Sequence, residues 1–297
     1  MRVVVAGSSG LIGTALKESL SADGHDVIAL VRREARGPDE SAWDPASGEI
    51  DRDVLAVADA VVNLAGASIG DKRLTDSYAQ VVLQSRLDAT GTIVRALADI
   101  EYQGVLLQGS AMGYYGARGE EELTERSPAG TNTLLARIVA KWEEAAEPAA
   151  EAGVRTIVAR TGLVLAPHGG FAERLLPLVQ KGLLRSFGKG DAWHAWITLH
   201  DHIRALRFLL DSDHAGAVNV IAPQSVRDAD LIRALSEAAG RSPGLPVPAW
   251  ALRTAIGPAI EDLLSSQKAS PGVLRRLGFT WDQAHIEAAA AWVIRSA

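Results

Sequence analysis

Residues 3–16 read VVVAGSSGLIGTAL, and this stretch decides the fold class. Apolar, β-forming residues come first, and glycines then recur at intervals of three before a helical pattern begins. Glycine weakens regular structure, so this spacing predicts a backbone that passes close to another group. The amino end of the following helix would offer unpaired N–H groups and positive potential to a pyrophosphate. The stretch therefore predicts a dinucleotide-binding turn whose contacts are Gly7, Gly10, Leu11, Ile12 and Gly13.

The composition is that of a globular protein, and it excludes several kinds of site. The chain has 297 residues and no cysteine, which excludes disulfides, thiolate metal sites and cysteine nucleophiles. Its net charge of −6 predicts no general attraction to nucleic acid or to an anionic membrane. No apolar run approaches the roughly 18 residues of a membrane span, and the first strand begins too early for a signal peptide. We therefore expect a cytoplasmic protein.

Short apolar runs alternate with helical patterns along the first half of the chain. The expected strands include RVVVAG, DVIALV, AVVNLAG, GVLLQGS and RTIVART, with helices from Thr14 and over Ile138–Glu151. This alternation predicts an α/β fold, a doubly wound parallel Rossmann sheet covered by helices on both faces. The rhythm breaks after Pro167. We predict a dinucleotide-binding domain at residues 1–167, to which 197–222 returns, and a smaller, mainly helical C-terminal lobe formed by 168–196 and 223–297.

The residues after the second expected strand indicate which dinucleotide binds. Folds that bind NAD place an acidic residue there for the ribose 2′-hydroxyl, whereas this chain has Arg32 and Arg33 after Val31. Arginine can bind a 2′-phosphate through charge-assisted hydrogen bonds. A P-loop is excluded because no lysine follows the glycines. The sequence thus predicts NADP, with Arg32 at the extra phosphate; the alternative is that both arginines are ordinary solvated residues.

A second stretch, VVNLAG at residues 61–66, ends an expected strand in small residues. Leu64, Ala65 and Gly66 would let the adenosine part of the cofactor pass with little obstruction. In the helix that follows, Arg86 would reach the cofactor phosphates. The alternative is a surface arginine paired with Asp88 or another acidic residue.

These motifs, with WDPASGEI, SRLDATGTIVRAL, SAMGYYG, WEEAA, NVIAPQSV and LLSSQKASPGVLRRLGF, resemble one branch of the extended short-chain dehydrogenase/reductase superfamily. It is the NAD(P)-binding epimerase family, whose members were once labelled cell-division-inhibitor homologues and carry a C-terminal domain of unknown function. The resemblance covers Arg2 to about Ala291. It implies a Rossmann fold, NADP binding and a substrate cleft beneath the C-terminal lobe. It also implies oxidoreduction or epimerisation of a small polar metabolite.

The resemblance further implies where the chemistry takes place. Ser110 lies in or beside the position of the catalytic Ser/Thr, with Ala111 as the competing alignment. Tyr115 matches the tyrosine of the YG pair that follows. The loop after Arg160 would bring Gly162 and Leu163 near the nicotinamide.

The usual proton relay of the superfamily is a Tyr with a Lys four residues later. Counting back from Arg160 places these positions at Leu134 and Ile138, neither of which can transfer a proton. We expect Ser110 with Tyr114 or Tyr115 to polarise the substrate, or a substrate group or water to supply the proton. The alternative is a catalytically inactive NADP-binding redox sensor or scaffold. A small-molecule partner is expected, and a homodimer is left open.

The stretch WHAWITLHDH, residues 193–202, gathers His194, His200, Asp201 and His202. A helix begins within it and disrupts a shared ligand face, so Asp201 as a helix N-cap is favoured over a metal site. Trp193 and Trp196 flank the expected cleft. For both, packing in the core is favoured over lining a substrate pocket.

Overall fold

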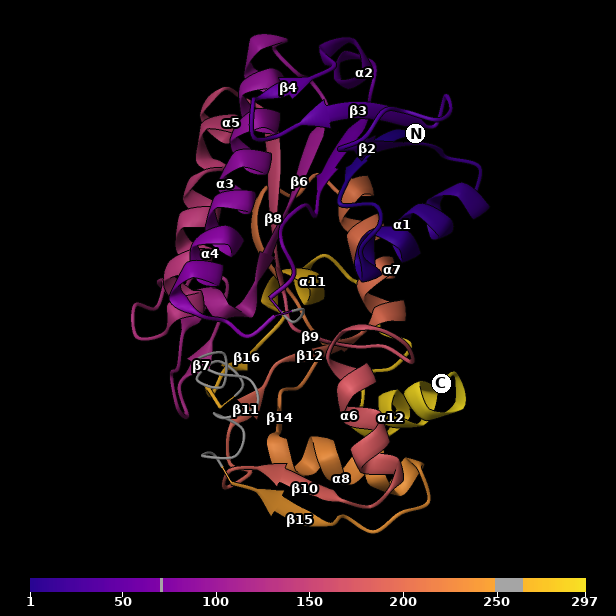
Figure 1. The fold of residues 1–297 in the computed structure, drawn as a ribbon, viewed down its shortest axis with the longest axis vertical. Coiled ribbons are helices and arrows are strands. Elements are labelled where there is room, and N and C mark those ends of the chain that lie inside the picture. The colour runs from indigo at the N-terminus through magenta and orange to yellow at the C-terminus, as the bar shows by residue number, and fades with distance from the viewer. Residues whose placement is uncertain (70–71, 249–263) are drawn as a thin grey trace.

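The computed structural model describes residues 1–69, 72–248 and 264–297, so residues 249–263 of the predicted lobe lie outside the described part of the chain. Its centre is an eight-stranded sheet in the order β13-β8-β6-β5-β1-β2-β3-β4 (Figure 1). All neighbouring strands are parallel except β3 and β4. The strands are β1 (Arg2–Ala6), β2 (Asp26–Val31), β3 (Glu40–Asp44), β4 (Glu49–Ile50), β5 (Ala60–Asn63), β6 (Val105–Ala111), β8 (Arg155–Thr161) and β13 (Gly216–Val220). The Rossmann sheet predicted from the sequence is confirmed.

Helices cover both faces of this sheet because alternate strand residues point to opposite sides. Val3 and Val5 of β1 pack in one apolar cluster with α1 (Leu11–Ala22) and α7 (Leu199–Asp211). Val4 of the same strand packs in the other cluster with α3 (Asp76–Asp99). The short helix α2 (Arg52–Ala56) and the pair α4 (Leu134–Glu144) and α5 (Glu147–Glu151) complete this second side. The strands are therefore apolar along both faces.

Two helix boundaries differ from the prediction. The first helix begins at Leu11 rather than Thr14, directly after Gly10. The expected helix over 138–151 is two helices, since α4 already begins at Leu134, with the Thr133 hydroxyl capping it. α4 ends at Glu144, and α5 begins at Glu147, after two intervening residues, with Pro148 in its first turn. Proline fits a first helical turn but not a helix interior, which explains the break.

The C-terminal lobe lies below the carboxyl ends of the sheet strands (Figure 1). Its core joins α6 (Gly170–Gln180), α8 (Asp228–Ala238) and α12 (Ile286–Arg295) around the fully buried Trp196. Strands of two to four residues tie the lobe together in pairs: β9 (Leu163–Leu165) with β12 (Trp196–Thr198), β11 (Trp193–His194) with β14 (Val226–Arg227), β10 (Leu184–Phe187) with β15 (Leu245–Val247), and β7 (Glu122–Leu123) with β16 (Lys268–Ala269). The short elements η1 (Met112–Tyr115) and α11 (Gly272–Arg276) lie where the lobe meets the sheet. No helix in the described ranges has both the length and the hydropathy to cross a bilayer.

Candidate functional site

The glycine turn joins β1 to α1, and its three glycines have different roles. Gly7 has a φ of 80°, and a Cβ there would lie 2.6 Å from the Leu64 backbone. A Cβ on Gly13 would lie 2.1 Å from the Gly7 carbonyl oxygen, so the turn itself leaves no room for one. A Cβ on Gly10 would meet nothing closer than 3.5 Å, and Gly10 is exposed. The packing of the protein thus requires Gly7 and Gly13, whereas Gly10 presents bare backbone to solvent at the start of a helix that has no side-chain cap.

The two arginines after β2 are in different environments. Arg33 forms a bidentate pair with Glu40, at 2.7 and 2.5 Å, and Arg36 N donates to the same carboxylate at 2.8 Å. The Arg33 hydrogen bond lowers the pKa of Glu40 to about 2. Arg32 is exposed, and no hydrogen bond or ion pair joins it to any residue that the structure describes. At the end of β2 the Arg33 guanidinium is therefore paired with Glu40, whereas the Arg32 guanidinium pairs with no residue that the structure describes.

Arg86 lies beside the small residues that follow β5. Its Nη1 donates to the carbonyls of Ala67 and Val82, both at 3.0 Å, and its guanidinium carbon lies 4.8 Å from the centre of the Trp142 ring. Burial lowers the pKa of Arg86 to about 10. No acidic side chain pairs with it within the described ranges, and Asp88 accepts instead from Gln84 at 2.7 Å. The surface pair with Asp88 is therefore not formed, and a partly desolvated cation faces the end of β5 without a counter-ion.

Buried polar groups fix the shape of this strand end. The Asn63 side chain donates to Thr90 at 3.1 Å and to Gln108 at 2.9 Å, and its Oδ1 accepts from Ala65 N at 3.2 Å. Leu64 N continues the ladder by donating to Ala6 O at 3.0 Å. Leu64 and Ala65 are half-buried and Gly66 is exposed, so the three residues follow the glycine turn closely on the same edge of the sheet.

Gly162 and Leu163 lead from β8 into the lobe. A Cβ on Gly162 would lie 2.7 Å from the Ala195 carbonyl oxygen, and Leu163 N donates to that same carbonyl at 2.8 Å. Both residues are half-buried at the carboxyl end of the sheet. Packing against Ala195 therefore explains why residue 162 is a glycine, independently of any contact with a cofactor.

Two of the three residues predicted to be catalytic, Ser110 and Tyr115, lie in one buried polar network. Ser110 is 5% exposed, and its hydroxyl donates to Glu143. Arg160 clamps the same carboxylate, with Nε at 2.9 Å and Nη2 at 2.8 Å. The Tyr115 hydroxyl accepts from Arg160 at 2.9 Å and donates to Asn219 at 2.7 Å, and burial raises its pKa to about 12. The hydroxyls of Ser110 and Tyr115 are therefore both engaged.

Tyr114 differs from these two neighbours. Its ring lies face-on to Arg160, with the guanidinium carbon 3.6 Å from the ring centre, and meets Tyr115 edge-on. Tyr114 is half-buried, and its hydroxyl has no partner among the described residues. Sequence reasoning missed Glu143, Arg160 and Asn219 as members of this network. Arg160 itself carried a signal in the sequence, because it is a charged residue near the end of the apolar run RTIVART.

The positions counted for a Tyr–Lys relay lie on α4. Ile138 is buried against Leu74, Ala79 and Val82, and Leu134 packs against the same cluster. Lys141 is exposed on another face of the helix. At these positions α4 therefore presents an apolar surface to α3.

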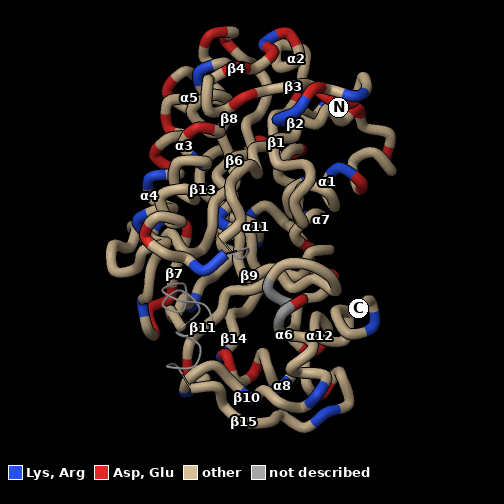
Figure 2. The backbone as a smooth tube through the Cα atoms, in the orientation of Figure 1, with Lys and Arg blue, Asp and Glu red and all other residues tan. Residues whose placement is uncertain are grey.

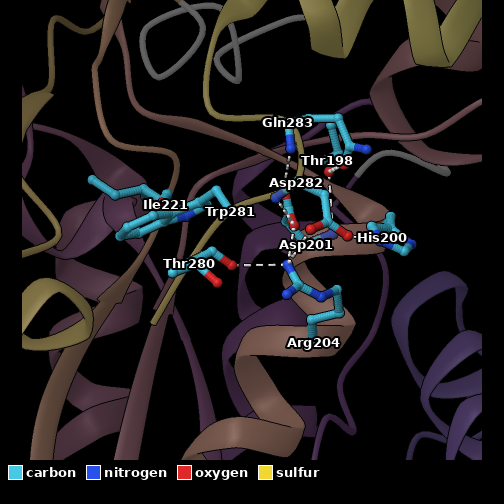
Figure 3. Close-up of polar contacts among 9 residues, drawn as sticks. All are labelled: Thr198, His200, Asp201, Arg204, Ile221, Thr280, Trp281, Asp282 and Gln283. Atoms are coloured by element: carbon cyan, nitrogen blue, oxygen red, sulfur yellow. Dashed lines mark hydrogen bonds and ion pairs between the residues drawn. The ribbon is translucent and has the colours of Figure 1, made fainter. Parts of the chain in front are cut away.

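The three histidines and the one aspartate of residues 193–202 lie in three separate places. His194 pairs with the buried Asp228 at 3.2 Å, and the fully buried His202 contacts Thr161 at 3.0 Å. Burial lowers the pKa of His202 to about 3. His200 contacts Asp282 at 2.8 Å, beside Asp201 (Figure 3).

The predicted N-cap role of Asp201 is wrong. Thr198 caps α7, and its hydroxyl accepts from Asp201 N at 3.1 Å. The Asp201 carboxylate is fully buried and accepts from Asp282 N at 2.9 Å, Gln283 N at 2.8 Å and Arg204 Nη1 at 2.8 Å (Figure 3). The Asp201 carboxylate therefore binds the backbone of a second segment, Asp282–Gln283, and fixes the chain that leads into α12.

The two tryptophans have different surroundings. Trp196 is 1% exposed in the lobe core, which confirms the packing role. Trp193 is half-buried, lies 4.1 Å from the Arg227 guanidinium, and donates its Nε1–H to Glu120 at 3.0 Å.

Comparison with known proteins identifies the family. A model described as the NAD dependent epimerase/dehydratase family matches residues 3–221, nearly three quarters of the chain. The chain belongs to this family. A second model, a domain of unknown function (DUF1731), matches residues 247–293. Both halves of the resemblance seen in the sequence are thus confirmed.

Individual members of the epimerase family are similar over almost the whole chain. "Epimerase family protein Mb2239" of Mycobacterium bovis is 40% identical over 279 residues, covering 93% of this chain and 92% of its own. The solved structure of human epimerase family protein SDR39U1 (isoform2) with NADPH has a TM-score of 0.89 at 30% identity, with 99% of both chains covered. A Thermus thermophilus UDP-glucose 4-epimerase complex with NAD, at 21% identity and a TM-score of 0.77 over 100% of this chain and 99% of its own, shares the fold. The cell-division-inhibitor label is not confirmed by these names.

Proposed function

We propose that this epimerase-family protein binds NADP, with the 2′-phosphate held by Arg32. The observation that carries the proposal is the unpaired Arg32 beside an Arg33 that Glu40 already occupies. An unpaired guanidinium at the end of the second strand can bind a phosphate, whereas NAD-binding folds have an acidic residue at this position. The NADPH in the human relative agrees, whereas NAD in the Thermus epimerase shows that the fold accepts either cofactor.

The remaining contacts follow from the residues at the same edge of the sheet. Exposed backbone at Gly10 and the uncapped start of α1, with Leu11 and Ile12, would hold the pyrophosphate between Gly7 and Gly13. Arg86, buried without a counter-ion, would supply a second positive charge. Leu64, Ala65 and Gly66 would pass beside the adenosine, and Gly162 and Leu163 beside the nicotinamide.

The proposed reaction is oxidoreduction or epimerisation of a small polar metabolite. Bound NADP would supply or accept a hydride. Among Ser110, Tyr114 and Tyr115, Tyr114 has the hydroxyl free to hydrogen-bond a substrate, while Ser110 and Tyr115 would act by fixing Arg160 beneath it. Polarisation by Tyr114, with the proton from water or from the substrate, would replace the Tyr–Lys pair.

A second candidate function is a redox sensor that binds NADP without turnover. The observation that favours it is the apolar packing of Leu134 and Ile138, where a relay would otherwise be expected. The two functions are separated by measuring NADPH oxidation with a panel of carbonyl compounds and nucleotide sugars. Turnover that falls in Tyr114→Phe, with NADPH affinity unchanged, supports the enzyme; tight NADPH binding with no turnover across the panel supports the sensor. We also propose a cytoplasmic location, and a homodimer stays open.

A further inference from the structure

β10 and β15 lie at the end of the molecule opposite β3 and β4 (Figure 1), and three exposed leucines lie on or beside these strands and α6. Leu178 lies in the last turn of α6, Leu183 precedes β10 and Leu245 begins β15; they are 40%, 57% and 77% exposed. Leu183 N donates to Leu178 O at 2.9 Å, and Leu245 N donates to Leu183 O at 3.4 Å. The three residues are therefore neighbours, and we call them the leucine tip.

Basic side chains surround the leucine tip. Lys181 and Arg185 are exposed, and neither has an ion-pair partner in the part of the chain that the structure describes. Arg241 is also exposed and donates Nε to Gln180 O at 2.9 Å. Residues 174–190 and 241–248 contain no Asp or Glu, although the whole chain has a net charge of −6. Figure 2 shows basic positions at this end of the molecule, around β10 and β15.

The nearby acidic residues of α8 offset the positive charge of this patch only in part, by one net negative charge. Asp230 and Glu237 pair with Arg233, at 3.0 and 3.5 Å. A hollow of about 370 Å³ beside the leucine tip is lined by Arg185 and Arg233 and also by Asp230, whose carboxylate pairs with Arg233. Arg185 pairs with no acidic residue that the structure describes, so it is the group there that can meet a phosphate.

The backbone of the tip also suits an apolar interface. Pro243 and Pro246 are exposed and have no N–H, so placing this segment against an apolar phase leaves fewer donors without a partner. Pro246 lies within β15 and opposes the addition of another strand to it. These features disfavour a partner that would pair with β15 as a strand.

We propose that the leucine tip docks the protein on the surface of an anionic phospholipid bilayer. The leucines would enter the boundary between headgroups and acyl chains, while Lys181, Arg185 and Arg241 would meet headgroup phosphates. The overall negative charge opposes contact in other orientations, so binding depends on this patch facing the membrane. The inference does not rest on cofactor binding.

The test is co-sedimentation of the full chain with large unilamellar vesicles at low and at physiological salt. Vesicles of equal parts phosphatidylglycerol and phosphatidylcholine are expected to bind the protein, more weakly as salt rises, and phosphatidylcholine alone is expected not to. The double variant Lys181→Glu/Arg185→Glu is expected to reduce partitioning at least about tenfold. Leu183→Ser/Leu245→Ser is expected to reduce it similarly. Each protein is checked for an unchanged melting temperature.

Val57 and Val81 are exposed to a similar degree, at 58% and 51%, but lie outside the patch. Val57→Ser/Val81→Ser is therefore the matched control and is expected to bind vesicles like the wild type. The proposal is overturned if anionic vesicles do not bind the wild type. It is also overturned if both tip variants partition like the wild type, or if the control loses binding as strongly as they do.

Discussion

Arg32→Glu is expected to reduce or reverse the preference for NADPH over NADH. Arg32 has no hydrogen-bond or ion-pair partner within the described ranges, so its replacement breaks none of the polar contacts that the structure describes. A hydrogen bond between charged groups contributes about 1.5–3 kcal/mol, which corresponds to about 10–150-fold in affinity. Arg32 is exposed, and screening at physiological salt favours the lower part of this range. Repulsion between the new carboxylate and the 2′-phosphate adds to the loss.

The assay is a fluorescence titration of the reduced cofactors with wild type and variant. NADPH affinity should fall by at least about tenfold, while NADH affinity should stay within about threefold, because NADH carries no 2′-phosphate. Arg33→Gln is the matched control. It breaks the pair with Glu40 and should lower the melting temperature while preserving the preference for NADPH.

Two results would refute the assignment of Arg32. An unchanged ratio of NADPH to NADH affinity in Arg32→Glu would show that the 2′-phosphate lies elsewhere. A ratio that changes in Arg33→Gln but not in Arg32→Glu would show that the wrong arginine has been chosen.

Three further predictions concern the turn and its surroundings. Gly13→Ala should lower the free energy of unfolding in urea by about 3 kcal/mol or more, because its Cβ would lie 2.1 Å from a carbonyl oxygen. Gly10→Ala should unfold like the wild type but bind cofactor more weakly. Equal stability of the two variants would contradict the packing role assigned to Gly13. Arg33→Gln should be less stable than the wild type at pH 7. The difference should shrink as the pH falls from 4.5 through about 2, because Glu40 binds its proton near pH 4.5 in the unfolded chain but only near pH 2 in the folded wild type. A pH-independent difference would exclude the ion pair as its cause. Arg86→Met should lower the affinities for NADPH and for NADH by the same factor, about tenfold, in the same titration. A loss of affinity for NADPH alone would place this arginine at the 2′-phosphate instead.

The fold could be predicted because its signals are local. The apolar runs, the glycine turn and the break after Pro167 each lie within one short stretch. The end of β2 marks the limit of this reasoning. Two adjacent arginines are equivalent in the sequence, and only Glu40, brought beside Arg33 by the pairing of β2 with β3, distinguishes them.

The predicted catalytic residues show the same limit more strongly. Ser110 finds its partner Glu143 33 positions later, and Tyr115 finds Asn219 104 positions later. Neither contact has a local signature, so the sequence could place these hydroxyls near one another but not show that they are engaged. The error at Asp201 is similar, since a competing cap at Thr198 frees its carboxylate for a segment more than 80 residues away.

Isothermal titration of the wild-type protein with NADPH and with NADH tests the central claim most directly. A free guanidinium beside an exposed glycine turn predicts that NADPH binds at least about tenfold more tightly than NADH. Equal affinities for the two cofactors, or no heat with either of them, would contradict it.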